Sequence, residues 1–85
     1  MLAIEYTKAA RKALEAMPAN VRRLVVAKIE ELAIDPARQH NNVTRLKGRP
    51  EFRLRVQDWR VIYRIVDDRL VLLILKIGAR GGVYK

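Results

Sequence analysis

The 85-residue chain has no cysteine and a single histidine, His40. Without cysteine it can form neither a disulfide framework nor a zinc site with thiolate ligands. One histidine in a polar stretch offers too few nitrogen ligands for a transition metal, so we expect no metal and no cofactor. The sequence also lacks an N-terminal signal pattern and an apolar run of membrane-spanning length. These absences predict a soluble cytoplasmic protein that acts without a membrane.

Acidic residues are also scarce. The chain has 9 Asp and Glu against 18 Lys and Arg, a formal net charge of +9. Residues 1–44 hold seven basic and five acidic side chains, whereas residues 45–85 hold eleven basic and four acidic. Such a field on a small chain attracts polyanions, either nucleic acid or an acidic protein. The length predicts one domain, residues 1–85, with a simple core.

Hydrophobic periodicity predicts a strand, two helices and three further strands. Residues 2–6 alternate and indicate a strand, after which Thr7 can cap a helix over 8–17. A second helix is expected over 19–33 and should end at Asp35-Pro36, because the residue before proline avoids the helical region. After a polar loop over 37–50, the expected strands are 52–56, 59–66 and 69–77.

This order predicts an α+β fold with an N-terminal strand, a helical hairpin and an antiparallel β-meander, the helices packing on one face of the sheet. The segment 69–77 is apolar at nearly every position, which is typical of a central strand. We therefore expect the first strand to lie beside it.

Arginines alternate with apolar residues in segment 51–65, EFRLRVQDWRVIYRI. If the larger apolar set faces the helices, four arginines share the opposite side of the sheet: Arg53, Arg55, Arg60 and Arg64. Like charges on neighbouring strands repel, unless an anion relieves them. Guanidinium groups bind phosphate and carboxylate in a bidentate manner. The pattern therefore predicts an anion-binding surface, with Lys47 and Arg49 as further phosphate contacts in a nearby loop.

Several segments, taken in order, resemble the RelE family of bacterial and archaeal toxins within the RelE/ParE superfamily. They are LKG (46–48), FRLRV (52–56), DWRVIY (58–63), IGAR (77–80) and VYK (83–85). The helical first half with its Asp-Pro stop fits the same family, so the resemblance covers essentially the whole chain.

The resemblance implies the toxin of a type II toxin–antitoxin system, a RelE-like fold and a ribosome-dependent endoribonuclease that cuts messenger RNA. In this family the ribose 2′-oxygen attacks the adjacent phosphate without a metal and leaves a cyclic phosphate. The family's catalytic positions match five residues here: Arg53, Arg55, Arg60, Arg80 and Tyr84.

The chemistry of these side chains limits their roles. Arginine keeps its proton at ordinary pH, so Arg53 and Arg55 are expected to stabilise the pentacoordinate phosphate rather than act as a base. By the resemblance, Arg60 is expected to grip the phosphate, and Arg80 to neutralise the leaving 5′-oxygen or assist its protonation. Tyr84 stacks on a base or transfers a proton. Arg64 is expected to contact RNA.

Two departures from the family pattern keep other functions open. Ala79 stands where relatives often carry His or Lys, and Gly81-Gly82 occupy a stretch where charged residues are common. One alternative is a ParE-like inhibitor of DNA gyrase, and another is a catalytically silent module whose basic face holds only an antitoxin. The full basic set favours the ribonuclease.

All three functions imply a cognate antitoxin with an acidic segment, in a toxin–antitoxin hetero-oligomer. The ribonuclease also implies the ribosome and messenger RNA as partners.

Overall fold

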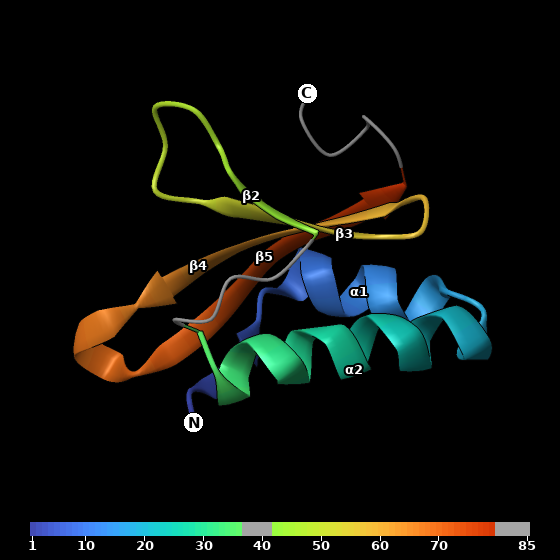
Figure 1. Ribbon diagram of the computed structural model, residues 1–85. Coiled ribbons are helices and arrows are strands. Elements are labelled where there is room, and N and C mark those ends of the chain that lie inside the picture. Colours follow the sequence, from blue (N-terminus) through green and yellow to red (C-terminus); the bar gives the residue numbers. More distant parts are fainter. Residues whose placement is uncertain (37–41, 80–85) are drawn as a thin grey trace.

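The computed structural model describes residues 1–36 and 42–79, in which two helices pack on one side of a five-stranded sheet (Figure 1). The helices are α1 (Lys8–Ala16) and α2 (Ala19–Ile34). The strands are β1 (Ala3–Tyr6), β2 (Val43–Arg45), β3 (Phe52–Val56), β4 (Trp59–Val66) and β5 (Val71–Ala79). A short 3₁₀ helix, η1 (Asp67–Arg69), joins β4 to β5. The predicted α+β fold is confirmed.

The strands lie in the order β1-β5-β4-β3-β2, with β1 parallel to β5 and the other neighbours antiparallel. The first strand therefore lies beside the last, as predicted, and β5 is flanked on both sides. Strand β2 was not predicted, because it falls within the polar stretch 37–50. Its three residues include only one apolar side chain, Val43, which is too little for an alternating pattern.

Local capping explains where the helices begin and end. Thr7 precedes α1, and its hydroxyl oxygen accepts a hydrogen bond from the Ala10 N–H at 3.1 Å, which confirms the predicted N-cap. Helix α2 follows Pro18 and ends before Asp35-Pro36. Between the helices, an Arg22 guanidinium nitrogen donates to the Met17 carbonyl oxygen at 3.2 Å.

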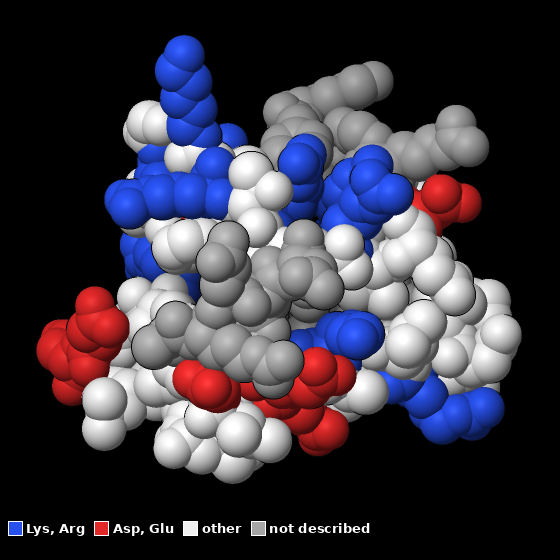
Figure 2. Space-filling view, in the orientation of Figure 1, with Lys and Arg blue, Asp and Glu red and all other residues white. Residues whose placement is uncertain are grey.

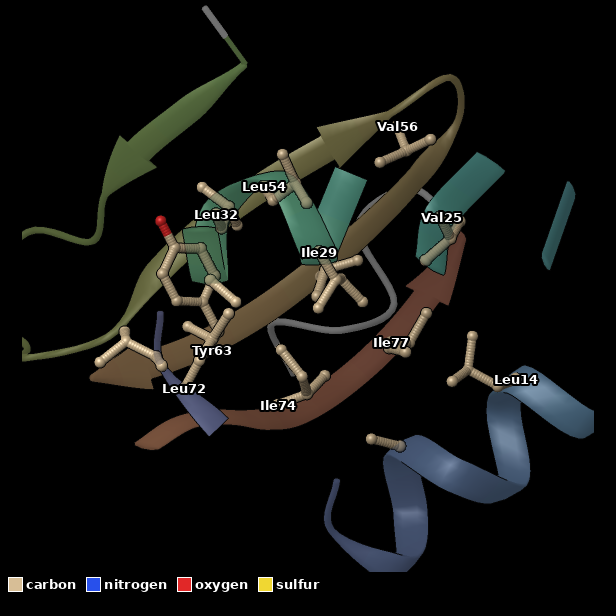
Figure 3. Packing of buried hydrophobic residues seen from close by; sticks show 14 of the residues in the cluster. Leu14, Val25, Ile29, Leu32, Leu54, Val56, Tyr63, Leu72, Ile74 and Ile77 are labelled. Carbon is tan, nitrogen blue, oxygen red and sulfur yellow. The ribbon is translucent and has the colours of Figure 1, made fainter. Parts of the chain in front are cut away.

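The core fills the space between the helices and one face of the sheet (Figure 3). The largest fully buried side chains are Ile29 and Val25 of α2, Val61 of β4, and Leu72 and Ile74 of β5. Because side chains alternate along a strand, this apolar face commits the intervening residues of β3 and β4 to the opposite side. Within the described residues, no helix is long and apolar enough to cross a membrane.

Candidate functional site on the outer face of the sheet

The side of the sheet that faces away from the helices, here called the outer face, collects the predicted arginines of β3 and β4. Leu54 and Val61 are partners in register and both are buried in the core. Since the neighbouring residues on each strand point the opposite way, the outer face receives the following side chains: Arg53, Arg55, Arg60, Ile62 and Arg64. The structure thus brings four of the predicted residues onto one side.

Arg55 and Arg60 are direct cross-strand partners. The β-carbons of such a pair lie about 4.5–5.5 Å apart, and like charges there are destabilising. Among the described residues, salt bridges join Lys28 to Glu31, Arg49 to Glu51 and Arg69 to Glu5. None of these pairs neutralises Arg55 or Arg60.

The Nη1 atom of Arg60 is buried and, within the described part of the chain, has no hydrogen-bond partner. A buried neutral donor without an acceptor costs about 1–3 kcal/mol of stability, and a charged donor costs more. On its β5 side Arg60 faces Gly78, which has no side chain to offer. An anion bound at this point would supply the missing acceptor.

Lys76 is a fifth cation of the outer face, and sequence reasoning missed it. Strict alternation from Leu72 and Ile74 would turn Lys76 toward the core, and the apolar run of β5 gives no sign of a change in side. In the structure Ile62 pairs with Lys76 but Tyr63 pairs with Ile74, so Leu75 has no partner on β4. This β-bulge reverses the alternation, and Lys76 shares the side of Ile62.

Ile62 is the centre of the cationic group. Its register partners are Arg53 on β3 and Lys76 on β5, and Arg60 and Arg64 lie two residues before and after it. Only 4% of Ile62 is exposed, although it lies outside the core cluster beneath the helices. Long basic side chains cover apolar surface with their methylene stems while their charged ends stay in water. The stems of these four neighbours are suited to cover Ile62.

Lys47 and Arg49 lie in the turn between β2 and β3. Gly48 between them has φ +71°, a conformation that favours glycine. Arg49 Nε lies 2.9 Å from a carboxylate oxygen of Glu51, so part of its charge is already matched. In Figure 2, Lys and Arg gather over β2 and this turn, whereas most Asp and Glu lie over α2 and the connection from β4 to β5. In this view the basic side chains over β2 and this turn are therefore separate from most of the acidic ones.

Aromatic contacts support the sheet on its helix-facing side. The rings of Phe52 and Tyr63 stack with centroids 5.4 Å apart, and the Arg45 guanidinium carbon lies 5.8 Å from the Phe52 ring centroid. Burial raises the pKa of Tyr63 to about 12. This tyrosine therefore stays protonated at neutral pH and serves packing.

The predicted catalytic residues Arg80 and Tyr84 lie outside the described residues, as does His40. Ala79, the last residue of β5, is the last described position before them. Their roles stay predictions. In residues 1–36 and 42–79, no group of three or more His, Cys, Asp and Glu side chains is placed to hold a metal ion.

Comparison with known proteins gives concordant matches. The family model for the ParE toxin of the parDE type II toxin–antitoxin system matches residues 4–84. The RelE1 protein of Methanocaldococcus jannaschii is 32% identical over 84 residues, which cover 96% of this chain and 93% of that protein.

Two solved structures share the architecture. The RelE–RelB complex of Pyrococcus horikoshii OT3 contains a chain with 28% identity and a TM-score of 0.80, with 95% of this chain and 97% of that chain covered. The intact RelBE toxin–antitoxin complex of E. coli contains a chain with 21% identity and a TM-score of 0.80, with 93% and 96% covered. At the latter identity the likeness concerns the fold alone.

Proposed function

The chain belongs to the RelE/ParE family of toxins of type II toxin–antitoxin systems, and from this premise we propose that it is a ribosome-dependent endoribonuclease that cuts messenger RNA. The supporting observation is the outer face, where Arg55 and Arg60 oppose each other and a buried nitrogen of Arg60 lacks a partner. A sheet gains no stability from this arrangement by itself. An RNA phosphate would relieve both the repulsion and the unmet donor.

In the proposed reaction the ribose 2′-hydroxyl loses its proton, and its oxygen attacks the adjacent phosphorus. The bond from phosphorus to the 5′-oxygen breaks, the leaving oxygen gains a proton, and a 2′,3′-cyclic phosphate remains. Arg60 and Arg55 would hold the non-bridging oxygens, whose negative charge grows in the transition state. Preorganised guanidinium groups can supply this stabilisation without a metal ion.

Proton transfer needs a group other than these arginines, because arginine stays protonated. By the family resemblance, Tyr84 would take part in this transfer, and Arg80 would neutralise the leaving 5′-oxygen. Arg53, Arg64, Lys47 and Arg49 would contact the RNA backbone around the reacting phosphate, where contacts position the strand without reading its sequence.

We further propose a cognate antitoxin as the partner that holds the toxin inactive. RelE chains of similar fold are found in complexes with RelB. An acidic antitoxin segment would cover the outer face in a hetero-oligomer. Since charge complementarity mainly raises the association rate, that rate should fall steeply as salt is added.

The test is translation on purified ribosomes followed by primer extension of the messenger RNA. Wild-type protein should give cuts in phase with the codons, and these cuts should disappear in Arg60→Ala and in Arg80→Ala. Arg23→Ala is the matched control, since it removes an exposed arginine from α2 on the opposite side of the molecule. Persistence of the cuts in Arg60→Ala would refute the assigned site.

A second function is supported by the family model, which is that of a ParE toxin. A ParE-like chain would inhibit DNA gyrase and would not cut RNA. Inhibition of gyrase supercoiling by wild-type protein, together with uncut messenger RNA on ribosomes, would favour this function. If neither activity appears, the silent antitoxin-binding module is left.

A further inference from the structure

The orientation of Lys76 depends on a single extra residue in β5. Leu72 and Ile74 are buried in the core, and Ile77, three residues beyond Ile74, is buried there as well. Strict alternation would bury Lys76 instead of Ile77. The bulge at Leu75 therefore does two things at once, since it returns Ile77 to the core and places Lys76 on the outer face.

Thr7, the residue that directly follows β1, holds this bulge. Strand β1 ends at Tyr6, which pairs with Ile74, and the Thr7 N–H continues the ladder to the Ile74 carbonyl at 3.0 Å. The Thr7 hydroxyl then donates to the Leu75 carbonyl at 2.7 Å. The same oxygen caps α1, so the helix start and the bulge are fixed by one side chain.

Lys76 is the only cation that β5 contributes to the outer face, and it is exposed. No ion pair among the described residues includes it. Across the sheet, the row Lys76–Ile62–Arg53 runs beside the row Gly78–Arg60–Arg55. Because Gly78 has no side chain, Lys76 supplies the positive charge on the β5 side of Arg60.

We propose that Lys76 binds a backbone phosphate of single-stranded RNA next to the one held by Arg55 and Arg60. Strand β4, which carries Arg60, lies between β3 and β5, and those two strands are about 10 Å apart. Lys76 on β5 and Arg55 on β3 can therefore contact different phosphates of one RNA strand. The inference rests on the proposed function, since it takes the outer face as the RNA site. It adds a contact on β5 that the arginine pattern of β3 and β4 does not contain.

The experiment is a titration of a short, fluorescently labelled single-stranded RNA at several salt concentrations, followed by fluorescence anisotropy. The binding constant K falls as salt is added, and each phosphate contact makes the negative slope of log K against log salt concentration steeper by about 0.7 for a single strand. Lys76→Gln should weaken binding and make the slope shallower by about this amount. Lys76→Arg should keep the wild-type slope. A structural role alone would leave the slope of the folded variant unchanged.

Lys12→Gln is the matched control, because Lys12 is an exposed lysine of α1 on the helix side. It makes the same change in net charge and should keep the wild-type slope. An unchanged slope in Lys76→Gln would overturn the proposal, and so would an equal loss in Lys12→Gln. Wild-type protein without salt-dependent RNA binding would overturn it as well.

The ribosome assay separates this inference from the proposed function. If wild-type protein cuts messenger RNA but Lys76→Gln keeps its full salt slope, the contact is wrong and the ribonuclease stands. If Lys76→Gln lowers the slope but wild-type protein never cuts, the phosphate contact stands and the ribonuclease is wrong.

Discussion

At the scale of single residues, the outer face places two arginines directly opposite each other, Arg55 on β3 and Arg60 on β4. Neither forms an ion pair within the described residues. Arg55 is exposed, whereas Arg60 is partly buried and carries the unpartnered Nη1. The pair is thus unfavourable for the free protein and suited to a bound anion, which makes Arg55 the residue to change.

Arg55→Ala should leave the free energy of unfolding unchanged or raise it by up to about 0.5 kcal/mol, because it removes like-charge repulsion across the strands. The same variant should lose cleavage in the ribosome assay. Thermal unfolding at low salt measures the first effect, with Arg55→Lys as the control that keeps the charge. A strong destabilisation by Arg55→Ala would contradict its placement on the outer face.

Tyr63 gives a prediction about alkaline pH. Burial raises its pKa from 10.0 to about 12, so the folded state favours the neutral phenol. Its contribution to stability is fully present below pH 10 and is lost as the pH rises through about 12. Between pH 10 and about 12, the free energy of unfolding should therefore fall less in Tyr63→Phe than in wild type.

Chemical denaturation at a series of alkaline pH values measures the difference. Burial, followed by the negative charge of Glu30, also raises the pKa of Tyr6, but Tyr6 is present in both proteins. Equal losses of stability in wild type and Tyr63→Phe would show that Tyr63 titrates normally.

At the scale of elements, two local conformations decide how β5 enters and crosses the sheet. One is the bulge at Leu75, held by the Thr7 hydroxyl. The other is Leu70, which closes η1 with φ 54° and ψ 45° and is 66% exposed. Both are set by backbone geometry, and the two residues to substitute, Thr7 and Leu70, lie outside the core cluster.

Thr7→Val should lower the free energy of unfolding by about 1–2 kcal/mol, since the valine keeps the shape but loses the N-cap acceptor and the bond to Leu75. Thr7→Ser retains the hydroxyl and should lie within about 0.5 kcal/mol of wild type. Urea denaturation of the three proteins gives the comparison. A Thr7→Val variant as stable as wild type would show that the two hydroxyl hydrogen bonds make no measurable contribution.

Leu70→Asn should raise the free energy of unfolding by about 0.5–1 kcal/mol, because asparagine adopts the left-handed conformation more readily than leucine. Leu70→Ala is the control, since alanine has no such preference and little packing is lost at an exposed site. Thermal unfolding distinguishes them. If alanine stabilises as much as asparagine, exposure of the leucine rather than its φ angle is responsible.

At the scale of the whole molecule, charge is the dominant feature. The net charge of +9 is spread over a small body, and basic side chains gather around β2 and its turn to β3 (Figure 2). Self-repulsion of this kind destabilises the compact state and draws polyanions to it. The stability of the free protein and its binding to RNA should therefore respond to salt in opposite directions.

Added sodium chloride should raise the midpoint of thermal unfolding while it weakens RNA binding, because it screens repulsion in one case and attraction in the other. Chloride is preferable to sulfate, which also strengthens apolar burial. A fall in the unfolding midpoint with salt would mean that the exposed ion pairs, Arg49 with Glu51 and Arg69 with Glu5, outweigh the net charge.

Sequence periodicity was sufficient for the two helices, for four of the five strands and for the outer face of β3 and β4. Alternation is strict in 52–56, and in 59–66 the larger apolar set is on one parity despite Ile62 on the other, so the pattern determines which side each arginine takes. Thr7 and Asp35-Pro36 act through local backbone chemistry, so the limits of the helices also followed from the sequence. These features depend on residues close together in the chain.

Tertiary structure alone decided β2, the bulge and the position of Lys76. Strand β2 exists through pairing with β3, and its own three residues carry no strong strand signal. The bulge arises because Ile74 and Ile77 must both reach the core, while Thr7, distant in sequence, binds the Leu75 carbonyl. An apolar run such as 71–75 looks the same in sequence with or without the bulge, since only packing across the sheet fixes the register.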